Sequence, residues 1–308
     1  MSALRRHLAD YLIIRRGMGF KLERAESLLG QFLDYIEHQR GETVTIEHAL
    51  AWATAPGGAG WWHALRMSAI RPFAVYLHAL DPAHQVPPPG LISYGSHRAT
   101  PYLYSDADIH ALLQAASCHP GRRTTTLTYP ALIGLLAATG MRIGEALALD
   151  TGDFDAERGI LTIRDTKFGK SRLLPLHSTT TAALGQYLEA SRRQGPAPRT
   201  EALFLSTAGT RLHYDRVHKT FRRMTRDAGL VPRSAACRPR VHDLRHSFAV
   251  TTLLEGYRRG DDMRTVIPRL STYLGHADPK HTYWYLSAAP ELLALAGDRL
   301  ESYLEDLR

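Results

Sequence analysis

The sequence predicts a mostly helical protein of two domains, with one small antiparallel sheet in the second domain. Its 308 residues are about twice the length of a domain of ~150 residues. Apolar residues recur at the three- and four-residue spacing of amphipathic helices through most of the chain. A short β-hairpin pattern occurs at residues 159–176, and a proline-rich run at residues 86–90 separates the two regions.

The first region is predicted to be a small helical bundle. Residues 20–39 place apolar side chains on one helix face and are followed by Gly41, which favours the end of a helix. A second amphipathic helix is expected at residues 61–80. We therefore expect a helical N-terminal domain at residues 1–86 and a linker at residues 87–101.

The second region, residues 102–308, is predicted to combine helices with the hairpin. The sequence Ser105-Asp106-Ala107-Asp108 is a capping-box pattern that favours the start of a helix. Residues 159–164 and 171–176 are the two predicted strands of the hairpin. Further helices are expected at residues 179–193, 214–228, 242–255 and 290–304.

The distribution of charge favours a polyanionic partner for the second region. The net charge is +8, and residues 1–86 contribute almost nothing to it, with 9 basic and 8 acidic side chains. Residues 211–240 contain 9 basic side chains and only two acidic ones. Their surplus of basic over acidic side chains equals the surplus of residues 87–308 as a whole.

Composition also excludes several classes of protein. The two cysteines, Cys118 and Cys237, cannot form a disulfide framework. The longest uncharged window, residues 124–141, is interrupted by Pro130 and Gly134 and is too short to span a bilayer. The N-terminus lacks the apolar core of a signal peptide. We therefore expect a soluble, cytoplasmic protein with no membrane contact.

Two basic residues lie at positions where a side chain could reach a ligand. Arg142 follows a glycine break between two apolar helical runs, where it either pairs with Glu145 or points into a cleft. Lys167 lies at the tip of the predicted hairpin, where most lysines are simply solvated.

The last third of the chain holds further candidate site residues. His242 and Arg245 are three residues apart on a predicted helix, so they share a face and can bind one anion. A zinc site at His242 and His246 is disfavoured because no third ligand is evident. His276 precedes an aromatic cluster at residues 283–285, a pattern more typical of a core when taken alone.

Taken together, these motifs resemble the tyrosine recombinase (phage integrase) family. The resemblance extends from about residue 104 to residue 286 and rests on the segments ATGMRIGE, TKFGKSRLLPL, HDLRHSFA and LGHADPKHTYWYL. It implies a helical core-binding domain and a catalytic domain that close as a clamp on duplex DNA. The segment TYWYLSAAPEL is most similar to integrases of transposable elements that encode several recombinases together.

The resemblance also implies roles for individual residues, without a metal ion or any other cofactor. Tyr285 would attack the scissile phosphate to give a 3′-phosphotyrosyl link, and Lys167 would protonate the leaving 5′-oxygen. His242 would also assist removal of the proton from the nucleophile. The groups expected to stabilise the phosphate are Arg142, His242, Arg245 and His276.

Two of these assignments have rivals nearby in the sequence. Tyr283 is an alternative nucleophile, although the spacing from His276 favours Tyr285. Lys170 is an alternative general acid, although alignment of the following RLLPL segment favours Lys167.

Contact with DNA is expected from the basic stretch. If residues 214–228 form a helix, its basic residues make one stripe and its apolar residues another, which faces the core. The alternative is a merely solvated face. The predicted DNA-binding residues are Arg216, Lys219, Arg223, Arg226 and Arg240.

The expected partner is double-stranded DNA, bound by a homotetramer on two sites, with companion recombinases as further candidate partners. Two other functions remain open at this stage, a type IB-like topoisomerase and a DNA-binding accessory protein that does not cleave. The predicted helix at residues 290–304 packs either on its own domain or on a neighbouring protomer.

Overall fold

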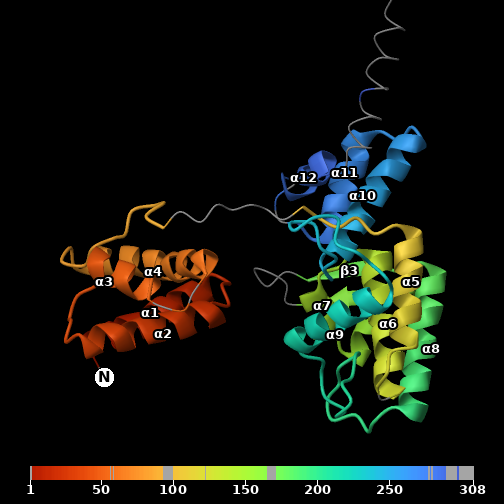
Figure 1. Ribbon diagram of the computed structural model, residues 1–308, viewed down its shortest axis with the longest axis horizontal. Helices are drawn as coiled ribbons and strands as arrows, with labels where there is room; N and C mark the ends of the chain where they lie inside the picture. The colour runs from red at the N-terminus through yellow and green to blue at the C-terminus, as the bar shows by residue number, and fades with distance from the viewer. Residues whose placement is uncertain are drawn as a thin grey trace, which may run out of the picture. The chain divides into compact units, whose positions relative to one another are not determined.

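The computed structural model describes residues 2–55, 57, 59–92, 100–121, 123–164, 171–276, 278, 280–288 and 297. These residues form two compact units, one that extends to residue 92 and one that begins at residue 100 (Figure 1). None of the described helices combines the length and the apolar character needed to cross a bilayer.

The first unit is built from helices, as the sequence predicts. They are α1 (Ala3–Gly17), α2 (Glu23–His38), α3 (Ile46–Ala53) and α4 (Gly60–Leu80). Helix α2 buries the apolar face expected from its spacing, with Phe32, Leu33 and Ile36 completely inaccessible to solvent. Thr45 caps α3 by accepting a hydrogen bond from the backbone N–H of His48 at 3.1 Å.

The second unit is organised around one central helix. Helix α6 (Arg123–Thr139) packs against α5 (Asp106–Ser117), α8 (Ser178–Gln194) and α10 (Asp243–Arg258), and Figure 1 shows α5, α6 and α8 side by side. Leu132 and Ile133 of α6 are about 1% exposed in this core. The predicted capping box at the start of α5 is present, because Ser105 and Asp108 each accept from the backbone N–H of the other.

The sheet of this unit has three short antiparallel strands in the order β1-β2-β3. Strand β2 (Ile160–Ile163) pairs with β3 (Arg172–Pro175), so that Ile163 lies opposite Arg172. The predicted hairpin strands are thus confirmed, whereas the third strand, β1 (Phe154–Asp155), was not predicted. Its two residues are too few to show an alternating pattern.

The described part of the unit also contains a short 3-10 helix (Thr151–Asp153) and four further α-helices. These α-helices are α7 (Ile143–Ala148), α9 (Tyr214–Asp227), α11 (Met263–Leu274) and α12 (Lys280–Ala288). Helix α9 directs Val217, Phe221 and Met224 into the core, as its spacing predicts. The predicted helix at residues 290–304, apart from residue 297, and the hairpin turn at residues 167–170 lie outside the described residues.

Candidate active site

Arg142 lies at a tight turn between α6 and α7. Gly140 occupies the left-handed region there with φ +59°, and a Cβ atom at this position would lie 2.5 Å from Cδ1 of Phe248. Arg142 follows as the N-cap residue of α7 and donates from Nη1 to Oε1 of Glu145 at 2.9 Å. Its Nη2 donates to the carbonyl oxygen of Gly275 at 3.2 Å. Arg142 therefore forms the ion pair with Glu145, while 39% of its side chain remains exposed.

Arg245 lies in the first turn of α10 and is almost completely buried, with 2% exposure. Its Nη1 donates to the carbonyl oxygen of Gly140, and its Nη2 donates to the carbonyl oxygen of Leu274, both at 2.8 Å. Nη2 also lies 2.8 Å from Nε2 of His276. A buried cation is costly unless acceptors surround it, and two turns supply these acceptors here. Arg245 thereby joins the turn after α6 to the turn after α11.

The charge of Arg245 is also influenced by its neighbours. Burial and, after it, the positive charge of Arg142 lower the pKa of Arg245 to about 10, whereas an interaction with Tyr285 opposes this shift. The guanidinium is still protonated at neutral pH. Two cations therefore lie close enough to repel one another, and an anion bound between them would relieve this repulsion.

His276 is held in one tautomer by its two neighbours. Because an arginine can only donate, Nε2 of His276 accepts from Arg245. Nδ1 therefore carries the proton and donates to Oγ1 of Thr282 at 2.8 Å. Thr282 lies on α12 and is completely buried, so this hydrogen bond connects His276 to the helix that holds the candidate nucleophiles.

The two candidate nucleophiles lie in different environments on α12. Tyr285 is buried, with 3% exposure, and its ring centroid is 5.4 Å from that of His246, 6.0 Å from that of His276 and 5.6 Å from that of Trp284. Tyr283 is 53% exposed. The structure therefore brings Tyr285, and not Tyr283, beside the histidines and Arg245.

His242 immediately precedes α10, and its ring reaches solvent beside three arginines. Burial of part of the ring, followed by the positive charges of Arg245, Arg142 and Arg240, lowers the pKa of His242 to about 4. The imidazole is therefore neutral at pH 7 and can accept a proton. Its ring centroid is 4.9 Å from that of His246, and within the described ranges no three potential metal ligands come together.

The low pKa of His242 predicts a loss of stability in mild acid. Between about pH 6.5 and pH 4 the unfolded chain protonates His242 and the folded chain does not, so folded stability decreases as the pH falls through this window. We expect wild type to lose more stability than His242→Asn between pH 7 and pH 5, measured by urea unfolding. Equal losses would contradict the shift, since His84, whose pKa is also lowered by burial, is unchanged in both proteins.

Arg240, a predicted DNA-binding residue, is engaged in an ion pair. Its Nε and Nη2 donate to the two carboxylate oxygens of Asp243 at 3.0 and 2.9 Å. Asp243 is completely buried, and burial raises its pKa, an effect that Arg240 opposes. This pair fixes the start of α10 and leaves 38% of the Arg240 side chain exposed, so DNA contact by Arg240 stays a prediction.

Two residues of the site were not singled out from the sequence. Thr282 orients His276, and Arg172 of β3 forms an ion pair with Glu145 at 2.8 Å. The only sequence signal for Arg172 was its place at the start of the RLLPL segment. The predicted general acid Lys167 and its rival Lys170 lie outside the described residues.

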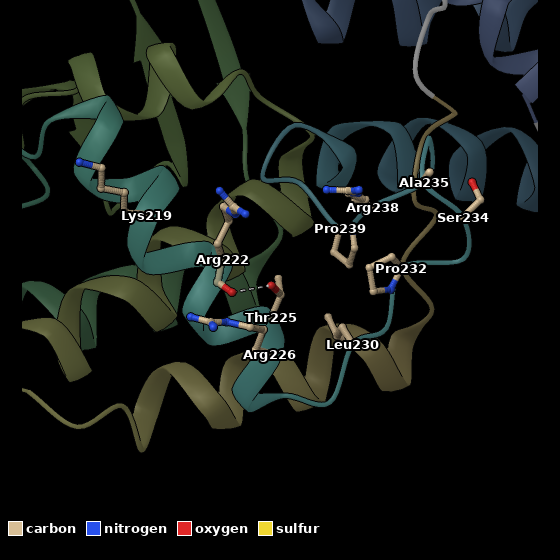
Figure 2. Close-up of a pocket in the computed structure, with 10 residues that line it drawn as sticks. All are labelled: Lys219, Arg222, Thr225, Arg226, Leu230, Pro232, Ser234, Ala235, Arg238 and Pro239. Carbon is tan, nitrogen blue, oxygen red and sulfur yellow. Dashed lines mark hydrogen bonds between the residues drawn. The ribbon is translucent and has the colours of Figure 1, made fainter.

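A basic groove of about 610 Å³ lies between α9 and residues 230–239 (Figure 2). We call it the α9 groove, and its cationic side chains are Lys219, Arg222, Arg226 and Arg238. In the part of the chain that the structure describes, none of these four forms an ion pair with a carboxylate. Their unneutralised charge makes this groove a candidate site for a polyanion.

The predicted basic stripe therefore divides between two surfaces. Lys219 and Arg226 line the α9 groove, whereas Arg216 lines a smaller pocket of about 150 Å³ beside Tyr129. Arg223 is exposed on the same helix and lines neither pocket. Helical spacing predicted the shared exposure of these residues, but it could not show that the 230–239 segment faces only some of them.

Comparison with known proteins identifies the family. Residues 104–291 match the phage integrase family. The integrase/recombinase y4rB of Sinorhizobium fredii is 43% identical over 312 residues, covering 99% of each chain. The tyrosine recombinase XerD of Bifidobacterium longum is 29% identical, covering 94% of this chain and 92% of XerD.

A solved structure of the Tn1549 transposon integrase, in complex with transposon right-end DNA, shares the fold. The TM-score is 0.65 at 16% identity, and the match covers 98% of this chain and 99% of the other. Together with the family match over more than half of the sequence, these relatives settle the classification. The chain belongs to the phage integrase family, whose members are tyrosine-type site-specific recombinases.

Proposed function

We propose that this recombinase cleaves and rejoins duplex DNA through a covalent bond between Tyr285 and a 3′-phosphate, without a metal ion or nucleotide. The position of Tyr285, buried beside Arg245 and His276, is the observation that supports this proposal most directly. A phosphoryl transfer needs positive charge around the phosphate. Arg142 and Arg245 supply two guanidinium groups, each with several N–H donors in one plane.

The proposed cleavage step forms one bond and breaks another. The hydroxyl oxygen of Tyr285 attacks the phosphorus, the bond to the 5′-oxygen breaks, and the DNA keeps its phosphodiester energy in the new phosphotyrosyl bond. His242, whose neutral ring at pH 7 has a nitrogen that can accept a proton, takes the proton of the tyrosine. Lys167 gives a proton to the 5′-oxygen. Attack by a 5′-hydroxyl of a second strand then reverses the step and exchanges the strands.

The direct test is formation of a protein–DNA adduct by the wild-type chain. Nicked suicide duplexes, cut from the ends of the element that encodes the protein, are incubated without Mg²⁺ and the products are separated in SDS. We expect a resistant adduct whose tryptic peptide, identified by mass spectrometry, carries the nucleotide on Tyr285. Tight binding without an adduct would instead support a non-cleaving accessory role.

We further propose that the basic residues of α9 hold the phosphate backbone of the DNA. The sequence-predicted residues Arg216, Lys219, Arg223 and Arg226 are all exposed on this helix. Two residues that the sequence did not predict add positive charge to the α9 groove (Figure 2). Arg222 lies on α9 itself, and Arg238 lies on the segment that faces it. Exposed arginines without carboxylate partners can each neutralise a phosphate.

Salt dependence provides a measurement of these contacts. The double variant Lys219→Ala/Arg226→Ala is expected to bind every duplex more weakly and to lower the slope of log K against log salt by about two. Arg192→Ala/Arg193→Ala, which removes two cations from the last turn of α8, one of them paired with Glu189, serves as the control and should leave the slope unchanged. Equal slopes for wild type and the α9 variant would exclude phosphate contact there.

We propose that residues 1–86 form a core-binding domain and that residues 87–101 link it to the catalytic domain. We also propose that four protomers assemble on two DNA sites. The reaction would serve the integration or excision of a mobile element. The name of the S. fredii relative, an integrase/recombinase, supports the mobile-element context. Mass measurement of complexes with one-site and two-site DNA should distinguish a dimer from a tetramer. Omitting companion recombinases from a complete recombination reaction tests whether they are needed.

A further inference from the structure

Glu145 is a carboxylate shared by two arginines. Its Oε1 accepts from Nη1 of Arg142 at 2.9 Å and from Nη1 of Arg172 at 3.1 Å. Its Oε2 accepts from the backbone N–H of Arg142 at 3.0 Å and from Nη2 of Arg172 at 2.8 Å. Each oxygen thus has two donors, which is the full capacity of a carboxylate. With its side chain 9% exposed, Glu145 depends on these donors rather than on water.

Arg172 also contacts the turn that places His276. Its Nε donates to the carbonyl oxygen of Tyr273 at 3.2 Å. Gly275 lies in the left-handed region with φ +68°, and a Cβ atom there would lie 2.7 Å from Nη1 of Arg172. The guanidinium of Arg172 is therefore packed against the backbone of Gly275, whose carbonyl oxygen accepts from Arg142.

The two arginines and the single carboxylate of this arrangement do not balance in charge. Arg142 and Glu145 alone would make a neutral pair, and a neutral pair attracts a phosphate only weakly. Arg172 brings a second positive charge to the same carboxylate, so that the three groups together keep a net charge of +1. The exposures of the two arginine side chains, 39% for Arg142 and 16% for Arg172, leave Arg142 as the more accessible cation.

We propose that Arg172 is a positioning residue for strand cleavage, which neutralises Glu145 so that the charge of Arg142 is available to the scissile phosphate. This inference rests on the proposed function, because it assigns Arg172 a part in the same reaction. Burial raises the pKa of Glu145, but Arg172 and then Arg142 outweigh this effect and keep the carboxyl ionised. Arg172 therefore also maintains the anion that orients Arg142.

The first experiment measures single-turnover cleavage of a suicide duplex by Arg172→Gln. We expect the cleavage rate to fall about 10- to 100-fold, while the affinity for DNA changes less than about threefold. The matched control is Arg211→Gln, because Arg211 also combines a carboxylate partner, Asp150, with carbonyl acceptors near α7. That control is expected to cleave within about threefold of wild type.

Two further measurements separate positioning from a simple loss of structure. In Arg172→Gln/Glu145→Gln both charges are absent, so Arg142 regains its net positive charge, while the amide oxygen of the glutamine at position 145 can still accept from Arg142; we expect cleavage about fivefold faster, or more, than in Arg172→Gln. A duplex with a neutral methylphosphonate at the scissile position needs less positive charge. The ratio of wild-type to Arg172→Gln rates is expected to shrink on this substrate by about tenfold.

The outcomes distinguish this inference from the proposed function. If wild type forms no adduct on either substrate, the cleavage mechanism itself is wrong. If wild type cleaves but Arg172→Gln is equally fast, or has the same deficit on both substrates and in the double variant, Arg172 has no positioning role. Recovery in the double variant together with a smaller deficit on the methylphosphonate duplex would support it, since a purely structural loss would lower the rate equally on both substrates.

Discussion

Replacing Tyr285 with phenylalanine is expected to abolish adduct formation, which corresponds to a decrease in the cleavage rate of about 10⁴-fold or more. The variant removes only the hydroxyl oxygen that would attack the phosphate. The ring contacts of Tyr285 with His246, His276 and Trp284 can be retained, so the fold of α12 should persist. The measurement is the SDS-resistant adduct on a suicide duplex, with DNA binding measured in parallel.

The adjacent tyrosine provides the control for this variant. Tyr283 is 53% exposed, so Tyr283→Phe is expected to form the adduct within about twofold of wild type. An adduct that persists in Tyr285→Phe and disappears in Tyr283→Phe would transfer the role of nucleophile to Tyr283. The two single substitutions therefore decide between the alternatives that the sequence leaves open.

Replacing Arg245 with lysine is expected to lower the cleavage rate by about 10³-fold and the free energy of unfolding by about 2–3 kcal/mol. A lysine keeps the positive charge but cannot reproduce the planar fork that reaches Gly140, Leu274 and His276 together. At least one buried carbonyl oxygen is then left without a donor. Single-turnover cleavage and urea unfolding of the same preparation measure the two effects.

Arg142→Lys is the informative comparison for this prediction. Arg142 is 39% exposed, and after its replacement Glu145 still accepts two hydrogen bonds from Arg172. We expect a large loss of cleavage but a change in the free energy of unfolding below about 1 kcal/mol. Cleavage by Arg245→Lys within tenfold of wild type would show that charge alone, and not the fork, is required at this position.

Several helices were predictable because one of their faces is buried. The spacing of Phe32, Leu33 and Ile36 in α2, and of Val217, Phe221 and Met224 in α9, gave both the helices and their buried sides. The hairpin was also predictable, because β2 and β3 are long enough to show a strand pattern. Strand β1 has two residues and became a strand only by pairing with β2.

The sequence predicted candidate site residues, but it could not predict the contacts between them. The resemblance to the family predicted Arg142, His242, Arg245, His276 and Tyr285 as site residues, and these five residues lie near one another in the structure. The contacts of Arg172 with Glu145, 27 residues earlier, and with Tyr273, 101 residues later, depend on how three elements meet. Local spacing carries no information on such contacts, so neither Arg172 nor the carbonyl acceptors of Arg245 could be anticipated.

Main-chain carbonyl oxygens at Gly140 and Leu274 hold Arg245, the carbonyl oxygen of Gly275 and the carboxylate of Glu145 hold Arg142, and none of these acceptors lies on α9. Laboratory evolution could therefore alter the surface of α9 extensively without disturbing the reaction centre. We therefore expect that DNA binding can be changed by selection without a loss of catalytic rate. Libraries that vary exposed α9 positions, and keep its basic residues and both glycines fixed, should yield a high proportion of active enzymes.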